Sequence, residues 1–256
     1  MDNSGITPGA QALRRGLELL RLLGQHQQEG LKLSDAIELV GLERSTVHRL
    51  LSCLVEEQFA EKDEASKRYR LGIDAMQLGS AAVRRLPLVT TYRPLMQRLA
   101  RMSGDTVFLM VRDGDEFVCL HREEGPYPVK VLTIKAGERR LLGISAGGLA
   151  LLASMDDEEI DDVLTRHKAD YEAIGLSPAI LLREVRETRR QGYASIVETI
   201  TPGACGLGKT IPSSLKISAA ISFGTITMRF THPRRTELSS LLASAFKDFR
   251  GRRSLR

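Results

Sequence analysis

Two short helical segments on either side of Val40-Gly41-Leu42 restrict the fold of this chain more than any other feature. The first covers about residues 34–41, and the second runs over about 43–58. Glycine directly after a helix adopts the left-handed backbone conformation that ends helices at little steric cost. The spacing therefore predicts two helices joined by a tight turn.

A further helix and a hairpin flank this pair. The helical spacing of Leu13, Leu17, Leu20 and Leu23 predicts a helix over about 11–25 with these residues on its apolar face. Residues 59–71 alternate apolar and polar around a polar turn, as β-hairpins do. This order of helix, helix-turn-helix and hairpin predicts a winged helix-turn-helix domain over 10–72. It is much more specific than a helix-turn-helix pattern alone.

The second helix of the pair has an apolar side and a polar side. Val47, Leu50, Leu51 and Leu54 recur at helical spacing and are predicted to point inward. The opposite side is left with polar side chains that can reach base edges and phosphates, and the hairpin adds basic residues that can contact the DNA backbone. The residues predicted to bind DNA are Arg44, Ser45, Thr46, His48, Arg49, Lys67 and Arg68. The alternative is an ordinary three-helix packing unit whose polar side is only solvated.

The net charge of +5 permits an anionic partner, but its distribution does not locate the binding site. Residues 1–79 hold 10 Lys and Arg against 12 Asp and Glu, a net charge of −2. Residues 80–256 hold 27 against 20, a net charge of +7. Local charge on the helix surface must therefore decide where DNA binds.

The rest of the chain predicts an α+β domain, so the fold class is α/β in the broad sense. Residues 73–102 are expected to form helices that link this domain, 103–250, to the first one. Strands are predicted over 106–111, 117–121, 129–134, 193–200, 204–211 and 217–230, and helices over 145–153, 156–167, 178–192 and 234–250. Most of these strands are separated by short turns, which predicts an antiparallel sheet.

Composition excludes several classes of protein. No apolar run reaches the roughly 18 residues that a membrane helix needs. Cys53, Cys119 and Cys205 lie far apart and form neither a CxxC pair nor an even disulfide set. The five histidines are not spaced as metal ligands. We therefore expect a soluble cytoplasmic protein with no metal and no cofactor.

Residues 203–210, Gly-Ala-Cys-Gly-Leu-Gly-Lys-Thr, match the phosphate-binding pattern GxxxxGK[ST]. A P-loop needs a helix directly after this pattern, whereas residues 217–230 are rich in β-forming residues. Asp248 is the only later aspartate, so no strand-terminal carboxylate is available for Mg²⁺. A glycine-rich turn and strand is the favoured interpretation, and nucleotide binding is the alternative. Lys209 is expected to face solvent or to bind the carboxylate of a ligand.

Residues 143–147, Gly-Ile-Ser-Ala-Gly, match the GxSxG pattern of serine hydrolases, with Ser145 before a predicted helix. The preceding run, residues 138–142, is too short and too charged for the buried strand that feeds a nucleophile elbow. A hydrolase is therefore favoured even less than a nucleotide-binding protein, and no enzyme is predicted.

Residues 41–51 and 68–72 resemble the winged helix of the IclR family of bacterial transcriptional regulators. Residues 148–153 and 189–193, with Glu198 and Pro202-Gly203, resemble the effector-binding domain of that family. The resemblance covers nearly the whole chain from residue 10. It implies a dimer or tetramer that binds operator DNA and responds to a small molecule, often an organic or aromatic acid.

The resemblance also implies the position of the effector pocket, between a curved sheet and the helix that starts near Ala146. The matching positions are Val129, Leu132, Ser145, Ala146, Gly147, Ile196, Ala204, Gly206, Ser222 and Gly224. Several of these are small or apolar, which leaves room for a ligand larger than a small keto acid. Plain core packing is the alternative for Val129, Leu132 and Ala204, and strand irregularities are the alternative for the two strand glycines.

Overall fold

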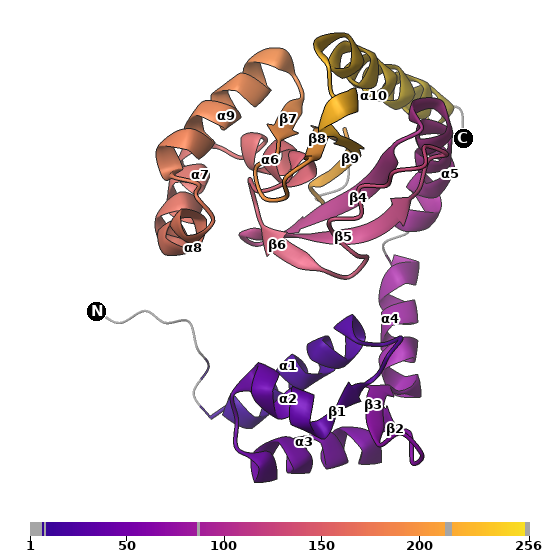
Figure 1. The fold of residues 1–256 in the computed structure, drawn as a ribbon, viewed down its shortest axis with the longest axis vertical. Helices are drawn as coiled ribbons and strands as arrows, with labels where there is room; N and C mark the ends of the chain where they lie inside the picture. Colours follow the sequence, from indigo (N-terminus) through magenta and orange to yellow (C-terminus); the bar gives the residue numbers. More distant parts are fainter. Residues whose placement is uncertain (1–6, 8, 86–87, 213–216, 254–256) are drawn as a thin grey trace. The chain divides into compact units, whose positions relative to one another are not determined.

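The computed structural model of the chain describes residues 7, 9–85, 88–212 and 217–253. The chain forms two compact units, residues 1–87 and 88–256, which are described separately (Figure 1). The segment 73–102, expected as one linker, is shared between them: α4 (Ile73–Arg85) lies in the first unit and α5 (Leu88–Ser103) in the second. The assignment of this segment as a linker stays a prediction.

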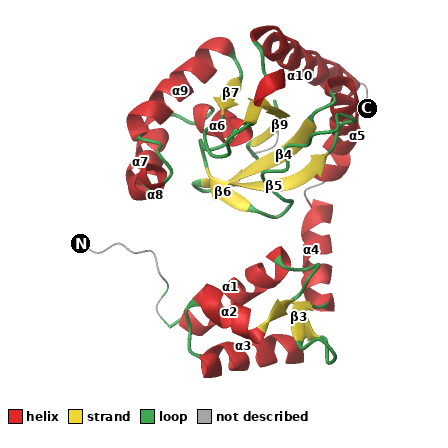
Figure 2. Ribbon diagram, in the orientation of Figure 1, coloured by secondary structure: helices red, strands yellow, loops and turns green. Residues whose placement is uncertain are grey.

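The first unit is a winged helix-turn-helix domain (Figure 2). It contains α1 (Gln11–Gln25), α2 (Leu33–Val40), α3 (Arg44–Glu56) and α4. Three short strands, β1 (Leu31–Lys32), β2 (Ala60–Lys62) and β3 (Arg68–Leu71), form an antiparallel sheet in the order β1-β3-β2. Gly41 has a φ of 62° and ends α2, as expected for the turn. Helix, helix-turn-helix and hairpin thus follow in the predicted order.

The predicted apolar face of α1 is wrong at Leu13 and Leu17, while Leu20 is half-buried and Leu23 is buried. Leu19 and Leu23 are fully buried against α3 and the small sheet, whereas Leu13 and Leu17 are 64% and 41% exposed. Leucine is so frequent in this helix that it forms two apolar stripes. Only the stripe with Leu19 and Leu23 meets the core, and the sequence alone does not distinguish the two.

The second unit contains a six-stranded antiparallel sheet in the order β6-β5-β4-β9-β8-β7. Helices α6 to α9 lie on one side of the sheet, and α5 and α10 lie on the other (Figure 1). The strands are β4 (Thr106–Asp113), β5 (Glu116–Glu123), β6 (Arg139–Leu141), β7 (Ala194–Val197), β8 (Ala204–Thr210) and β9 (Ala219–Ile226). The remaining helices are α6 (Ala146–Ala153), α7 (Asp157–Arg166), α8 (Lys168–Ala173), α9 (Pro178–Gln191) and α10 (His232–Arg253). This α+β architecture was predicted.

Strand β4 separates two hydrophobic cores. Val107 and Leu109 belong to the core under α5 and α10, while Phe108 and Met110 belong to the core under α6 to α9. Successive side chains of a strand point to opposite faces, so one continuous apolar run supplies both cores. Residues 129–134, predicted as a strand, lie instead in the loop between β5 and β6.

Helix α6 lies unusually close to the sheet because small residues form its contact surface. A β-carbon added at Gly148 would lie 2.7 Å from the ring of Phe117, and one added at Gly208 would lie 2.5 Å from the carbonyl oxygen of Ala146. Both distances are shorter than van der Waals contact allows. The glycines therefore permit the backbone of α6 to pack directly on β8, which places the N-terminus of this helix against the sheet.

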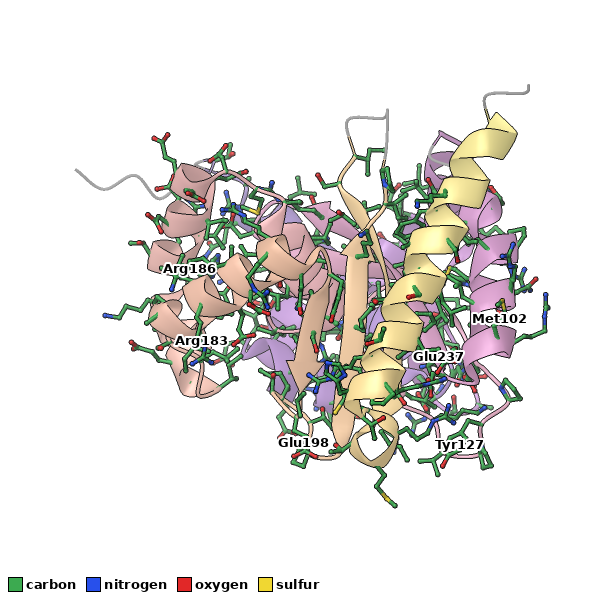
Figure 3. The ribbon with its side chains drawn as sticks, turned by 90° about the horizontal axis from the view of Figure 1, so that it is seen from above. Met102, Tyr127, Arg183, Arg186, Glu198 and Glu237 are labelled. Carbon is green, nitrogen blue, oxygen red and sulfur yellow. The ribbon has the colours of Figure 1, made fainter. Side chains whose placement is uncertain are left out.

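A buried carboxylate joins the start of β4 to α10. The side chain of Asp105 accepts a hydrogen bond of 2.6 Å from Arg234 and forms an ion pair of 3.4 Å with Arg229. The guanidinium carbon of Arg229 lies 3.8 Å from the ring centroid of Tyr127, and Arg234 also binds Glu237 at 2.7 Å. Tyr127 and Glu237 both lie at this end of the unit (Figure 3). The cluster ties the segment after β5 and the segment after β9 to the same carboxylate.

Candidate DNA interface and effector pocket

The polar side of α3 is exposed, and its apolar side holds the helix in the core. Val47 and Leu51 are fully buried, so the rotation of α3 about its axis is fixed. Among the residues predicted to bind DNA, Arg44, Ser45, His48 and Arg49 are exposed and Thr46 is half-buried. The exposed residues recur at positions i, i+1, i+4 and i+5, which lie on one face of a helix. The structure therefore brings this part of the predicted set together.

The two arginines of this face are available to a ligand. Within the described residues, neither Arg44 nor Arg49 forms a hydrogen bond or ion pair. Guanidinium groups bind phosphates and the edge of guanine through two parallel hydrogen bonds. An exposed helix face with two unpaired guanidinium groups is therefore chemically suited to the major groove of DNA.

The basic residues of the hairpin already have partners inside the protein. Lys67, with a φ of 55°, forms an exposed ion pair of 2.7 Å with Glu64, and its hydrogen bond holds the pKa of Glu64 below the usual value. Arg68 donates a hydrogen bond of 2.7 Å to the carbonyl oxygen of Gly30. Arg68 thus ties β3 to the turn before β1. Contact of Lys67 and Arg68 with DNA stays a prediction.

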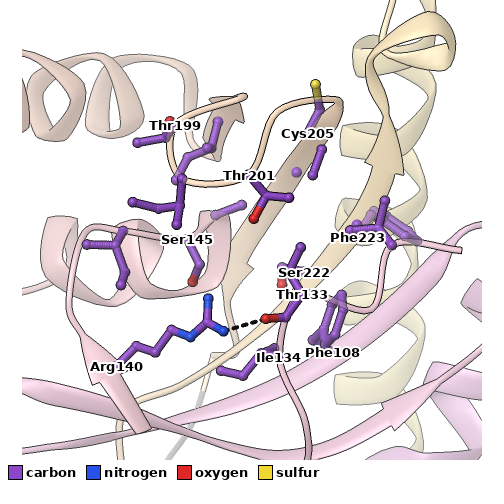
Figure 4. Close-up of a pocket in the computed structure, with 18 of the residues that line it drawn as sticks. Phe108, Thr133, Ile134, Arg140, Ser145, Thr199, Thr201, Cys205, Ser222 and Phe223 are labelled. Carbon is purple, nitrogen blue, oxygen red and sulfur yellow. Dashed lines mark hydrogen bonds between the residues drawn. The ribbon is translucent and has the colours of Figure 1, made fainter. Parts of the chain in front are cut away.

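A pocket lies between the N-terminus of α6 and the sheet (Figure 4). Seven of the ten residues predicted to bind the effector line it: Ser145, Ala146, Ile196, Ala204, Gly206, Ser222 and Gly224. Ser145 is the N-cap of α6, and its hydroxyl oxygen accepts a hydrogen bond of 3.0 Å from the amide of Gly148. The strands β7, β8 and β9 supply the other wall.

Three of the predicted residues do not line this pocket. Val129 and Leu132 are 56% and 45% exposed, because the segment that carries them is a loop and not a strand. Their neighbours Val131 and Thr133 line the pocket in their place. Gly147 is buried behind the pocket, where an added β-carbon would meet the sulfur of Met110.

The pocket has apolar walls and a few polar groups. Rings and aliphatic side chains come from Phe108, Phe117, Val131, Ile134, Ile144 and Ile196. Hydroxyl groups come from Thr133, Thr199 and Thr201 as well as from the two serines. Arg140 brings a charged group that the sequence analysis did not assign to the site. The sequence feature that could have suggested Arg140 is strand alternation, because it places Arg139 and Arg140 on opposite faces of β6.

The described residues of the GxxxxGK[ST] pattern do not form a P-loop. Residues 204–210 are strand β8, paired with both β7 and β9, so no helix N-terminus follows the glycines. Lys209 donates a hydrogen bond of 2.8 Å to the carbonyl oxygen of Gly192, the residue that ends α9. The lysine therefore satisfies a helix-terminal carbonyl. This bond was not among the expectations for Lys209, which were a side chain that faces solvent or one that binds the carboxylate of a ligand.

The serine of the GxSxG pattern serves as a helix cap. Besides accepting the hydrogen bond from Gly148, the Ser145 hydroxyl lies 3.6 Å from the sulfur of Met110. No histidine lines the pocket within the part of the chain that the structure describes. Ser145 thus lacks, among these residues, the neighbouring base that activates a serine nucleophile.

The described residues contain neither a metal-binding cluster nor a membrane-spanning helix. They include no cluster of three or more His, Cys, Asp or Glu side chains with the arrangement of a metal site. They also include no helix whose length and apolar character would let it cross a membrane.

Comparison with known proteins agrees with this geometry. A relative at 30% identity is the HTH-type transcriptional regulator BhcR of Paracoccus denitrificans, aligned over 94% of this chain and 86% of that protein. The transcriptional repressor IclR of Escherichia coli is 27% identical, over 94% of this chain and 89% of the repressor.

Solved structures with a similar fold include two IclR proteins. One, from Alicyclobacillus acidocaldarius, has a TM-score of 0.77 at 22% identity and covers 93% of this chain and 96% of that one. Another is an IclR homolog from Microbacterium hydrocarbonoxydans in complex with 4-hydroxybenzoate, with a TM-score of 0.73 at 24% identity, covering 94% and 100%.

Two family models together span most of the chain. The IclR helix-turn-helix domain matches residues 12–64, which contain α1 to α3 and β2. The bacterial transcriptional regulator IclR C-terminal domain matches residues 80–249, which contain the large sheet and the pocket. The chain belongs to the IclR family of DNA-binding bacterial transcriptional regulators.

Proposed function

We propose that this regulator binds a pseudo-palindromic operator as a dimer or tetramer, with α3 in the major groove. The observation that carries the proposal is the exposed face of α3, where Arg44 and Arg49 have no partner among the described residues. Ser45, Thr46 and His48 lie beside them and add hydrogen-bonding groups for phosphates or base edges. Two copies of the chain would read two half-sites one helical turn apart or a multiple of it.

The pocket of the second unit would bind a small organic or aromatic acid. Its apolar walls suit a carbon skeleton, and its hydroxyl groups suit a polar substituent. The structural neighbour from Microbacterium hydrocarbonoxydans, whose complex contains 4-hydroxybenzoate, supports an aromatic acid as a probe. The effector changes operator affinity by binding one arrangement of the subunits more tightly than the other. The cytoplasm, where bacterial operators lie, is the proposed location, and regulation of transcription rather than catalysis is the proposed role.

The experiment that tests DNA binding uses the purified chain and the region upstream of its own gene. Binding is measured by fluorescence anisotropy at several salt concentrations, with excess unrelated DNA as competitor. We expect a complex that survives the competitor and weakens as salt rises, because phosphate contacts release counterions. The variant Arg44→Ala/Arg49→Ala should lose this complex while keeping the thermal stability of the parent protein.

Selection from random DNA, with and without candidate acids, follows if the upstream region is not bound. Failure of both experiments would contradict the proposal that this chain binds an operator. Retention of full affinity in the double variant would contradict the assignment of α3 as the recognition helix.

A further inference from the structure

Arg140 is the only charged side chain among the described residues that line the pocket. It enters from β6, below Ser145 and beside Thr133 (Figure 4). The other lining groups are hydroxyls, a thiol, a thioether and hydrocarbon side chains. A cation in such surroundings interacts strongly with an anion, because apolar walls screen charge less than water does.

The register of β6 explains why one of two consecutive arginines enters the pocket. Arg140 is paired with Phe117, which also lines the pocket, while Arg139 is paired with Val118. Arg139 points to the opposite face, where its guanidinium binds Asp113 and, at 2.9 Å, Glu116. The hydrogen bond with Glu116 raises the pKa of Arg139 above its usual value. Arg139 is thus neutralised by two carboxylates of the protein.

Arg140 is only partly satisfied by the protein. Its Nη2 donates a hydrogen bond to the carbonyl oxygen of Thr133. It also forms an ion pair with Glu138, whose carboxylate oxygen lies 3.6 Å away, beyond hydrogen-bond distance. Its Nε and Nη1 have no hydrogen-bond partner within the described residues. A guanidinium carries five N–H donors, so four of them form no hydrogen bond with the described residues: one on Nε, two on Nη1 and one on Nη2. Nearly a third of the side chain, 31%, is exposed, which leaves these donors accessible from the pocket.

The rest of the pocket defines what the bound anion must carry. Phe108, Ile134 and Ile196 offer surface to a ring or an alkyl chain. Carboxylates pair with guanidinium groups through two parallel hydrogen bonds, whereas a neutral amide presents one acceptor and no charge. An arginine in a partly enclosed site therefore binds an acid more tightly than the corresponding amide.

We propose that Arg140 is the residue that selects the effector, by binding the carboxylate of an acid whose body is apolar. This inference rests on the proposed function of the pocket as the effector site. It assigns the recognition of charge to a side chain of β6, in addition to the amide groups at the N-terminus of α6. It also predicts that the effector is an acid and not its neutral analogue.

The test compares acids with their amides. The probes are benzoate and benzamide, 4-hydroxybenzoate and 4-hydroxybenzamide, hexanoate and hexanamide, and pyruvate and pyruvamide. Affinity for the full chain is measured by isothermal titration calorimetry in the parent protein and in Arg140→Met. We expect at least one acid to bind more tightly than its amide, and Arg140→Met to weaken that acid by roughly ten- to a hundredfold. The affinity of the amide should stay nearly constant.

Arg139→Met is the matched control, because it removes the neighbouring arginine from the other face of the same strand. It should preserve the preference for the acid. Glu138→Gln is a second variant that keeps a hydrogen-bond acceptor and removes the negative charge near Arg140. It should strengthen binding of the acid, and this variant tests the proposal even if Arg140→Met does not fold.

Three results would overturn the proposal. The first is that no acid binds the parent protein more tightly than its amide. The second is that Arg140→Met keeps the preference unchanged. The third is that Glu138→Gln weakens the acid. Operator affinity without ligand is measured in parallel in the parent protein and in Arg139→Met, so failure of DNA binding would be seen separately from failure of acid recognition.

Discussion

Arginines on α3 and arginines in the C-terminal unit have opposite surroundings. Arg44 and Arg49 are exposed, and no described residue forms an ion pair with them. Most arginines with ion pairs in the C-terminal unit are held by acidic side chains from a different element or from the next turn of the same helix. These pairs include Arg112 with Glu159, Arg139 with Asp113 and Glu116, Arg166 with Asp115, Arg189 with Asp157, Arg190 with Glu187, and Arg234 with Asp105 and Glu237.

This difference explains why net charge points to the wrong part of the chain. Residues 80–256 carry a net charge of +7, from 27 basic and 20 acidic residues, but many of these arginines are neutralised locally. Residues 1–79 carry a net charge of −2, from 10 basic and 12 acidic residues, yet they contain Arg44 and Arg49 on the exposed face of α3, where no described residue forms an ion pair with them. A DNA-binding surface is therefore better located from unpaired cations than from a sum of charges.

The largest effect on stability is expected at Asp105, the buried carboxylate that forms ion pairs with two arginines. Asp105 is 5% exposed, so Asp105→Ala leaves the guanidinium groups of Arg229 and Arg234 without their shared partner. Breaking a buried ion pair on one side costs about 3–5 kcal/mol of folding free energy. Urea unfolding of the variant should show this loss. Glu187→Ala, which breaks an exposed ion pair, is the control and should lower the free energy of unfolding much less.

Replacing an exposed arginine of α3 should weaken operator binding and leave the stability of the protein nearly unchanged. Arg49→Ala should weaken operator binding by about 1–3 kcal/mol and reduce the salt dependence if the side chain contacts a phosphate. The free energy of unfolding should change by less than about 0.5 kcal/mol, since no described contact is lost. The matched control is Arg190→Ala on α9, where the arginine is paired with Glu187. Equal losses of affinity in the two variants would mean that DNA binding follows total charge.

Lys209 lies between the arginines that pair with carboxylates and the exposed arginines of α3, because its side chain donates a hydrogen bond to a backbone carbonyl. Lys209→Met removes the hydrogen bond to Gly192 and should destabilise the protein by about 0.5–1.5 kcal/mol. Thermal unfolding measures this change, and operator affinity should stay the same. ATP should not stabilise the parent protein or the variant. Stabilisation by ATP that disappears in Lys209→Met would revive the nucleotide-binding alternative.

The smallest effect is expected for a pair at the surface that responds to pH. The hydrogen bond from Arg166 is the main reason why the pKa of Asp115 is lowered. A carboxyl group with a lowered pKa in the folded state adds stability above its unfolded pKa of about 3.9 and loses it as pH falls further. Arg166→Ala should therefore destabilise the protein only slightly at pH 7, and this destabilisation should shrink below pH 4. Urea unfolding at pH 7 and pH 3 measures the difference, and an equal cost at both pH values would contradict it.

The winged helix was predictable from sequence because its signals are local. A glycine turn, helical spacing and a short hairpin each act over a few residues, and together they fixed which side of α3 is polar. The face of α1 was not predictable, because two leucine stripes satisfy the same periodicity. Only contact with α3 and the sheet selects one of them.

The pocket was predictable in outline and not in detail. The predicted residues on β7, β8 and β9, together with Ser145 and Ala146, line the pocket because these elements were recognisable, whereas Gly147 does not line it. Val129 and Leu132 were misplaced because the alternation of residues 129–134 resembles a strand, although the segment forms no ladder with a neighbouring strand. Arg140 was missed because its direction depends on the pairing of β6 with β5, a contact between distant parts of the chain.

The two-sided character of β4 has a consequence for signalling. Phe108 borders the pocket, and the adjacent Val107 packs in the same core as α5, which is the first element of the C-terminal unit. The pocket and α5 are thus separated by the thickness of a single strand. Close-packed layers resist compression and move as a body, so a shift of the sheet must be accommodated by α5. The sheet therefore has the pocket on one face and, on the other, helix α5, the first element after the DNA-binding unit in the sequence.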